Sequence, residues 1–354
     1  MPPLAAVFEG PGQPLSLRSF QDPCPGEGQA AVEISCCTLC GSDLHSIRGD
    51  RSVPVPTILG HEMVGRISSL GGDLRDEAGV LLEVGDRVSW SLTASCGTCF
   101  YCRNSLPQKC ESLFKYGHQQ LSERHPLSGG LATHCLLAKG TSVVKIPTGL
   151  PDEVASPANC ATATVAAAFR AAGPCGDQTV LIHGAGMLGL TAAAMARVRG
   201  ARHVIVSDPR EDRRRQAEQF GADPVTPADL PGLTEGRGAD LVMDFSGAPE
   251  AVEEAVSQVR IGGRVILVGS VFPTRALSLQ ADELVRRLLR IEGVHNYTAA
   301  DLVEAFAFLA EAHEQFPFRA LVGASYPLAG IDDAVESALL GEHFRVAVRP
   351  RKDG

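Results

Sequence analysis

Four cysteines lie within fifteen residues of the chain and could bind one metal ion. Cys96, Cys99, Cys102 and Cys110 follow the spacing C-x2-C-x2-C-x7-C. Four thiolates at this spacing can surround a Zn²⁺ ion tetrahedrally, with sulfur–zinc distances of roughly 2.3 Å. A site closed in this way is structural, because it leaves no position for a substrate. The spacing therefore predicts a zinc-binding lobe at about residues 94–112.

A second group of candidate metal ligands comes from three separate segments. Cys40 begins the segment CGSDLH, His61 and Glu62 follow a glycine, and Cys160 follows an asparagine. Two thiolates and one imidazole are a recognised catalytic zinc set, in which water or substrate takes the fourth position. Ordinary burial of these residues is the alternative. The remaining cysteines are expected to be small core residues: Cys24, Cys36, Cys37, Cys135 and Cys175.

A glycine motif suggests that the chain also binds a dinucleotide. Gly184, Gly186 and Gly189 follow the apolar segment TVLIH and begin a helical segment. The first glycine permits a tight turn, the second lets the backbone approach a pyrophosphate, and the third allows close helix–strand packing. N–H groups at the helix start, at Met187 and Leu188, can bind phosphate. Helix packing alone is the alternative interpretation.

An acidic residue after the next apolar segment strengthens this interpretation. HVIVSD ends in Asp208, at about the distance expected of an acid that binds the adenosine ribose 2′-hydroxyl. A carboxylate there repels a 2′-phosphate, so NAD is favoured over NADP. Arg210 and Arg213 lie nearby, and an arginine can accommodate the additional phosphate.

The patterning of the chain changes near its middle. Short β-rich segments punctuated by glycine and proline, such as AAVEIS, PTILGHEMVGRIS, GDRVSWSL and HCLLAKG, indicate a partly closed antiparallel barrel. From residue 178, apolar β segments alternate with helical stretches, which is typical of a parallel doubly wound sheet. We predict an α/β protein with a Rossmann domain at 156–295. The β-rich catalytic domain would comprise residues 1–155 and 296–354.

Composition excludes several classes of protein. The 354 residues are 44% hydrophobic, which is enough for two domain cores, and the net charge of −9 gives no electrostatic footprint for nucleic acid. Glycines and His183 interrupt the longest uncharged run, so no membrane span is expected. The first residues show no signal-like pattern, and we expect a reducing, cytoplasmic compartment.

The order of these motifs resembles that of zinc-dependent medium-chain alcohol dehydrogenases. CTLCGSDLH, GHE, the four-cysteine lobe and the late dinucleotide motif occur in the order of that family, over nearly the whole chain. The resemblance implies a GroES-like catalytic domain and two zinc ions per chain, with Cys40, His61 and Cys160 as catalytic ligands. In one departure, polyol-type members carry a glutamate where this chain has Cys160.

The resemblance also assigns roles around the metal. Glu62 corresponds to the acid behind the zinc, Ser42 to the hydroxyl that contacts the reacting alcohol, and His45 to the far end of a proton relay. Zinc acidifies a bound alcohol as it does bound water, and the relay would carry the proton to solvent. From the residues alone, Ser42 could instead cap a helix, and His45 could be a surface residue.

In the second domain, the resemblance implies that Val268, Gly269 and Ser270 face the nicotinamide carboxamide. Arg345, near the C-terminus, corresponds to an arginine that binds the cofactor pyrophosphate. A surface position at the end of a strand is the alternative for Arg345. The family commonly forms homodimers or homotetramers, and the same is expected here.

The substrate is less defined by the sequence. LPQKCESLFKYGH and PANCATATVAAAFRAAG resemble a bacterial subgroup associated with phosphonate catabolism, which implies a small hydroxyalkyl phosphonate as substrate. Such a dianion needs cationic neighbours, which Arg48, Arg51, Lys115 and His118 could supply. Solvated surface charge is the alternative.

Three functions are therefore considered. The first is a zinc-dependent oxidoreductase that transfers hydride between a small alcohol, or its carbonyl form, and NAD. The second is a polyol, sugar or amino-alcohol dehydrogenase of the same family. The third is a zinc-stapled nucleotide-binding protein without turnover. In each case the expected ligands are small molecules, with neither nucleic acid nor membrane as a partner.

Overall fold

The computed structural model describes residues 2–350 and separates into two compact units. Unit 1 comprises the described residues up to Cys160, Thr298–His313 and those from Phe318 onward. Unit 2 comprises Ala161–Tyr297 and Glu314–Pro317. The sequence places the boundaries after residues 155 and 295, slightly before those of the structure.

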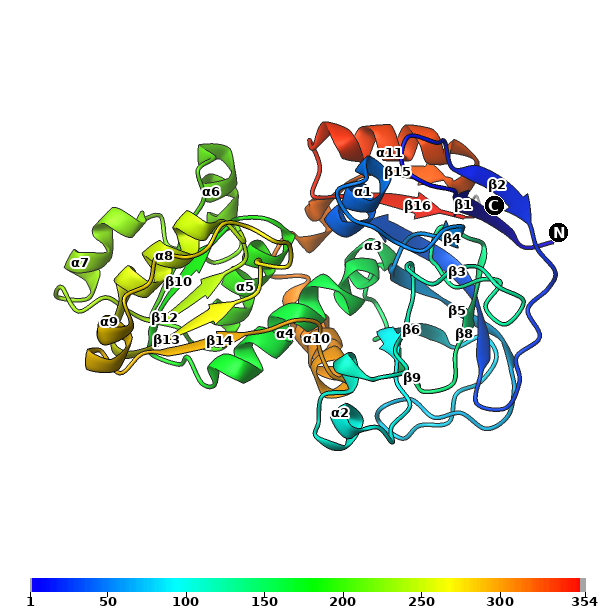
Figure 1. The fold of residues 1–354 in the computed structure, drawn as a ribbon, viewed down its shortest axis with the longest axis horizontal. Coiled ribbons are helices and arrows are strands. Elements are labelled where there is room, and N and C mark those ends of the chain that lie inside the picture. Colours follow the sequence, from blue (N-terminus) through cyan, green and yellow to red (C-terminus); the bar gives the residue numbers. More distant parts are fainter. Residues whose placement is uncertain (1, 351–354) are drawn as a thin grey trace. The chain divides into compact units, whose positions relative to one another are not determined.

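Unit 1 is built mainly from strands (Figure 1). Its strands are β1 (Leu4–Phe8), β2 (Ser16–Ser19), β3 (Ala30–Leu39), β4 (Thr57–Ile58), β5 (Glu62–Leu70), β6 (Arg87–Ala94), β7 (Phe114–Lys115), β8 (His134–Leu137), β9 (Thr141–Lys145), β15 (Val322–Pro327) and β16 (Arg345–Arg349). Its helices are α1 (Gly41–Arg48), α2 (Phe100–Arg103), η1 (Pro107–Lys109), α3 (Asp152–Ala155), η2 (Ser156–Asn159), α10 (Ala299–Ala312), η4 (Phe318–Leu321), η5 (Leu328–Gly330) and α11 (Ile331–Leu340).

These strands form two sheets. The larger has the order β15-β16-β3-β5-β6-β7, with β8 also paired to β3 and β9 to β6, and the smaller has the order β2-β1-β4. β16 pairs antiparallel with β3, which places Val346 opposite Leu39. Leu328, Ile331 and Val346 share one apolar cluster with residues of β1 and β3. The end of the chain therefore completes the core of unit 1.

Unit 2 contains the parallel sheet. Its elements are α4 (Ala161–Ala172), β10 (Thr179–His183), α5 (Met187–Val198), β11 (His203–Ser207), α6 (Glu211–Glu218), η3 (Pro227–Asp229), α7 (Leu230–Leu233), β12 (Ala239–Asp244), α8 (Pro249–Gln258), β13 (Val259–Leu267), α9 (Ala281–Arg286) and β14 (Arg290–Gly293). The strand order is β11-β10-β12-β13-β14, with every pair parallel. Every residue of β10 is buried, which is typical of a parallel strand covered on both faces. The predicted α/β class is confirmed.

One predicted β segment is divided in the structure. PTILGHEMVGRIS forms β4 and β5, separated by Leu59, Gly60 and His61. Gly60 has φ +85°, and an added Cβ would lie 2.8 Å from the Cys37 sulfur and 3.0 Å from the Leu131 nitrogen. Only glycine fits this left-handed, crowded turn. The turn places the side chain of His61 between two strands rather than within one.

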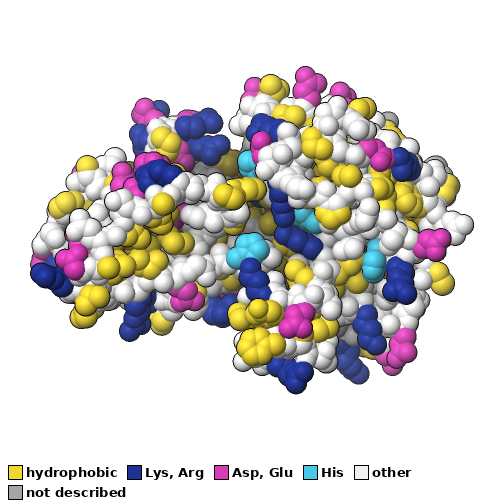
Figure 2. All heavy atoms as spheres, viewed as in Figure 1, with side chains coloured by type: hydrophobic (Ala, Val, Ile, Leu, Met, Phe, Trp, Pro, Cys, Tyr) yellow, Lys and Arg dark blue, Asp and Glu magenta, His cyan; other side chains and the backbone are white. Residues whose placement is uncertain are grey.

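Positive and negative side chains are interspersed on the face shown in Figure 2. Within residues 2–350, all cysteines are free of disulfides. No helix in the same range has both the length and the apolar character needed to cross a bilayer.

The glycine motif of unit 2 provides a stability test. A Cβ on Gly189 would lie 1.7 Å from the carbonyl oxygen of Gly184, whereas a Cβ on Gly186 would meet no atom within 4 Å. We expect Gly189→Ala to lower the free energy of unfolding by about 2 kcal/mol or more, because α5 must move away from the turn. Gly186→Ala should cost at most about 1 kcal/mol, as an N-cap change. Equal shifts in thermal unfolding would contradict this account of the turn.

Candidate active site

The structure brings the predicted metal ligands of unit 1 together. The ligand atoms of Cys40, His61, Glu62 and Cys160 all lie within 4.8 Å of one another. Cys40 follows β3 and caps α1, His61 and Glu62 flank the start of β5, and Cys160 follows η2. Because these elements come from distant parts of the chain, the cluster depends on the sheet of unit 1.

The chemistry of this cluster suits zinc. Two thiols and an imidazole are ligands that Zn²⁺ prefers, and the Glu62 carboxylate offers an oxygen as a fourth donor. A hydrogen bond from Cys160 and the charge of Arg345 hold the pKa of Cys40 well below its usual range, although burial opposes this. Cys40 is therefore prepared to bind a cation as the thiolate. Cys40, His61 and Cys160 would hold the ion, with Glu62 adjacent.

A buried carboxylate orients the imidazole ligand. Asp43 is fully buried, and its Oδ1 lies 3.2 Å from His61 Nδ1 while accepting a hydrogen bond from Gly60 N at 3.1 Å. Its Oδ2 accepts from Cys40 N at 2.9 Å. Burial opposes protonation of His61, but Asp43 and Cys40 outweigh it and raise the pKa of His61 to about 10. Metal binding at Nε2 would therefore release a proton.

Glu62 is paired with an arginine from the far end of the chain. Arg345 donates from Nε and Nη2 to the two Glu62 oxygens, both at 2.7 Å, and Thr38 Oγ1 donates to Oε2 at 2.6 Å. Burial raises the pKa of Glu62 to about 7 although Arg345 opposes the shift. Arg345 also lies 3.4 Å from Cys40 Sγ. This buried ion pair borders the cluster, and the cofactor role expected of Arg345 stays a prediction.

The two predicted relay residues lie on α1. Ser42 Oγ is 3.3 Å from His61 Nε2, so its hydroxyl adjoins the atom that would bind the metal. His45 is one turn later on the same helix face, and its Nδ1 is 3.1 Å from Asp50 Oδ2, in a pair exposed to solvent. The helix thus joins the metal cluster to the surface.

The four-cysteine lobe has the geometry of a second metal site. Cys96, Cys99, Cys102 and Cys110 have all four sulfurs within 4.8 Å of one another. The Cys96–Cys102 and Cys99–Cys110 sulfur pairs are 4.0 Å and 3.9 Å apart, close to the roughly 3.8 Å that tetrahedral Zn–S bonds require. Hydrogen bonds from Thr98 and from Cys99 N lower the pKa of Cys96 to about 6. The lobe fits a structural zinc ion.

In unit 2, the glycine motif forms a turn suited to phosphate. Gly184 has φ +95° directly after β10, and Gly186 caps α5 with open space where a side chain would be. Asp208 follows β11, and its carboxylate accepts hydrogen bonds from Ala185 N and Arg210 N. A cavity of about 700 Å³ is lined by Gly184, Gly186, Asp208, Arg210 and Arg213, among others. The turn and the acid that the sequence predicts thus line one cavity.

The segment after β13 is held by the main chain of a buried residue, Asp244. Val268 N and Gly269 N both donate to the carbonyl oxygen of Asp244. The Asp244 carboxylate accepts from Ser246 and Gly247 on the neighbouring loop. The predicted role of the segment 268–270 toward nicotinamide stays a prediction.

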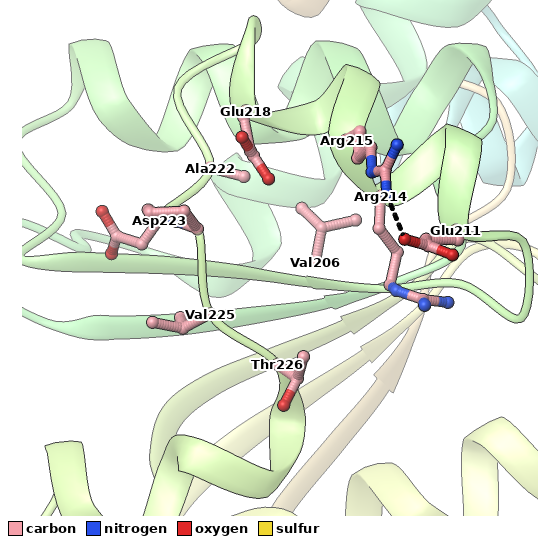
Figure 3. Close-up of a pocket in the computed structure, with 10 residues that line it drawn as sticks. Val206, Glu211, Arg214, Arg215, Glu218, Ala222, Asp223, Val225 and Thr226 are labelled. Carbon is pink, nitrogen blue, oxygen red and sulfur yellow. Dashed lines mark hydrogen bonds and ion pairs between the residues drawn. The ribbon is translucent and has the colours of Figure 1, made fainter.

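A second hollow in unit 2 is smaller and holds no predicted site residue. It has a volume of about 210 Å³ and lies between α6 and the segment 222–226 (Figure 3). Glu211 and Arg215 point toward one another at its edge and form an ion pair. Asp223 is engaged by Arg197 and the Val204 nitrogen. Glu211, Arg215 and Asp223 are therefore engaged within the protein.

The predicted substrate residues adjoin the metal cluster. The rings of His118 and His61 have centroids 5.4 Å apart, and burial lowers the pKa of His118 to about 3. Burial and the charge of Arg51 lower the pKa of Lys115. Arg48 instead donates to the Leu339 carbonyl.

Sequence reasoning missed the residues that support the ligands. Asp43, Thr38 and Ser156 are fully buried polar residues with hydrogen bonds to the ligand-bearing segments. For Asp43 a signal was present, because an acid three residues after Cys40 completes a capping box at the start of α1. For Thr38 and Ser156 the sequence offers no comparable signal.

Comparison with known proteins places both units among dehydrogenases. Residues 26–148 match the alcohol dehydrogenase GroES-like domain, and residues 188–311 match the zinc-binding dehydrogenase family model. L-threonine 3-dehydrogenase of Thermococcus kodakarensis is 32% identical over 84% of this chain and 82% of its own. An alcohol dehydrogenase of Geobacillus stearothermophilus is 32% identical over 96% of each chain. The structure of an alcohol dehydrogenase from Thermotoga maritima superposes with a TM-score of 0.93 at 30% identity, covering 99% of this chain and 100% of that one.

The Asp43–His61 bond yields a test of the metal site. Asp43→Asn removes the charge that orients the imidazole, and we expect zinc affinity at the Cys40 cluster to fall by about tenfold to a hundredfold. Competition with a chromogenic chelator measures it. Asp50→Asn alters the exposed partner of His45 on the same segment and should leave zinc affinity unchanged. Equal zinc affinity in the two variants would contradict the role of Asp43.

Proposed function

This chain belongs to the zinc-dependent medium-chain alcohol dehydrogenase family, and we propose that it oxidises a small alcohol with NAD at the Cys40–His61–Cys160 site. The family predicted from the motifs is confirmed by the comparisons. One observation carries the proposal: a zinc-suited cluster of two thiols and an imidazole has a serine hydroxyl 3.3 Å from the imidazole nitrogen. When bound, zinc supplies Lewis acidity toward the substrate oxygen, and nicotinamide accepts the hydride.

The chain's own residues would handle the proton. Ser42 is placed to accept it from the substrate hydroxyl, because its oxygen adjoins His61 Nε2. His45, one turn along α1, would pass it to solvent with Asp50 as its partner. Arg345 pairs with Glu62 beside the cluster. The Glu62 carboxylate is therefore neutralised by the guanidinium and does not need to bind the metal ion.

For the cofactor, the proposal favours NAD. Gly184, Gly186 and Gly189 form the turn, and the N-terminus of α5, at Met187 and Leu188, would receive the pyrophosphate. Asp208 would bind the ribose 2′-hydroxyl and repel a 2′-phosphate. Arg213 lines the same cavity.

Two narrower substrate classes are also proposed. An amino alcohol is favoured by relatives named L-threonine 3-dehydrogenase, which cover most of this chain. A small hydroxyalkyl phosphonate is supported by the basic residues beside the metal cluster. Kinetic comparison of an amino alcohol, a hydroxyalkyl phosphonate and neutral alcohols decides between them.

The activity test uses the zinc-loaded protein, NAD and this panel of alcohols, with NADH formation followed by absorbance. We expect Ser42→Ala to reduce kcat by about a hundredfold or more, because positioned proton transfer contributes factors of that size. Ser42→Thr, which keeps the hydroxyl, should restore most of the loss. Absence of NADH production with any alcohol would instead support a nucleotide-binding protein without turnover.

We further propose that the protein forms a homodimer or homotetramer through unit 2. β14 is an edge strand of its sheet, and Val285 of α9 and Leu288 of the following turn are 72% and 70% exposed. Exposed apolar side chains beside an unpaired strand edge favour association. Light scattering should give a molar mass of two or four times 37.3 kDa. The double substitution Val285→Glu and Leu288→Glu should lower this mass toward that of one chain. A monomeric wild-type protein would contradict the proposal.

A cytoplasmic location is also proposed. Two zinc sites that use six cysteines between them need reduced thiols. The described cysteines form no disulfide. Cell fractionation is the check, and recovery in an oxidising compartment would contradict it.

A further inference from the structure

We propose that Arg51, Lys115 and His118 form a subsite for an anionic oxyacid group on the substrate, with a phosphonate or phosphate that keeps one P–OH as the best match. The inference rests on the proposed function, because it defines the class of alcohol that this dehydrogenase takes. Phosphonates and phosphate monoesters share the recognised chemistry: charged oxygens together with a hydroxyl.

The segment that carries Lys115 and His118 packs directly against a metal ligand. A Cβ on Gly117 would lie 2.8 Å from the Gly60 oxygen and 3.2 Å from His61 Cβ. The His118 and His61 rings are 5.4 Å apart. Lys115 lies on β7, opposite Thr93 of β6. Residues 115–118 therefore border the metal cluster.

Arg51 reaches the same place from a different segment. It follows α1, and its nitrogen donates to the His45 carbonyl at 3.2 Å. Its charge acts on both Lys115 and His118. Lys115 in turn interacts electrostatically with Cys40 and Cys160. Arg51, Lys115 and His118 thus lie within electrostatic range of one another, and the Lys115–His118 segment borders the metal cluster.

The Arg51 and Lys115 side chains have no ion-pair or hydrogen-bond partner among the described residues. Both residues are partly buried. The nearby acid, Asp43, is already engaged with His61 and two backbone nitrogens. Adjacent, partly buried cations repel one another, and a bound anion would relieve that cost.

His118 adds a requirement that a carboxylate does not meet. It is 9% exposed, and its Nδ1 lies 2.9 Å from the Tyr116 carbonyl oxygen, so Nδ1 carries the hydrogen. Nε2 is then an acceptor, and this buried atom has no partner in the described structure. A P–OH group can donate to Nε2 while its charged oxygens face Arg51 and Lys115. Carboxylate oxygens have no hydrogen to donate.

The test compares an anionic and a neutral alcohol. With zinc-loaded protein and NAD, we expect Lys115→Met and Arg51→Met to lower kcat/KM for 2-hydroxyethylphosphonate by about tenfold to a hundredfold each, the usual value of a charge-assisted contact. For 1-propanol the change should stay within about twofold. Arg124→Met removes one exposed charge of the same unit and serves as the matched control, with neither substrate affected. Equal losses for both alcohols, or none, would overturn the subsite.

Two further arms separate the possible outcomes. Calorimetric binding of ethylphosphonate, which lacks the reacting hydroxyl, should weaken at least tenfold in Lys115→Met. His118→Phe, checked to retain two zinc ions, should reduce the preference for 2-hydroxyethylphosphonate over 3-hydroxypropionate, and an unchanged preference would overturn the role of His118. A 3-hydroxypropyl phosphate arm distinguishes a phosphate ester from a phosphonate.

The inference and the proposed function can fail separately. If the wild-type enzyme oxidises 1-propanol but shows no Lys115-dependent discrimination of anions, the subsite is wrong and the dehydrogenase stands. If ethylphosphonate binds in a Lys115-dependent manner but no alcohol is oxidised, the subsite stands and the proposed function fails.

Discussion

The buried carboxylate of Asp43 joins the two segments on which the metal site depends. One oxygen accepts from the nitrogen of Cys40, and the other accepts from Gly60 and contacts the imidazole of His61. A single side chain therefore sets the start of α1 and the turn before β5 at the same time. Its desolvation cost is offset because both oxygens are occupied. The same hydrogen bonds of Asp43 therefore orient the candidate ligands and stabilise the local fold.

The Glu62–Arg345 pair extends this arrangement to the end of the chain. Two parallel hydrogen bonds of 2.7 Å link residues that are 283 positions apart. The pair is possible because β16 lies beside β3, which also leads into Cys40. Removing either partner would leave a buried charge uncompensated. The strand β16 thus supports the candidate metal site as well as the core.

The two zinc-suited clusters differ in what holds them. The four-cysteine lobe is assembled within one short segment, where turns and backbone N–H groups direct the sulfurs inward. The candidate ligands of the Cys40 cluster come from the residue after β3, the start of β5 and the residue after η2. Lys115 and His118 of one further segment interact electrostatically with this cluster, and Arg51 of another segment interacts with both. A local site can be closed by its own spacing. A site that is open to substrate is also bordered by residues of other segments, and in our proposal those residues select the substrate.

The sequence alone indicated the four-cysteine spacing, the candidate ligands Cys40, His61 and Cys160, the glycine turn with Asp208 and the change from antiparallel to parallel β structure. These features are local: a spacing of a few residues or a periodicity specifies each. Only the tertiary structure decided that Asp43 supports His61, that Arg345 pairs with Glu62, and that Arg51, Lys115 and His118 share one place. Those contacts join segments separated by many residues. Strand pairing brings the segments together, and no local sequence pattern at either residue indicates its partner.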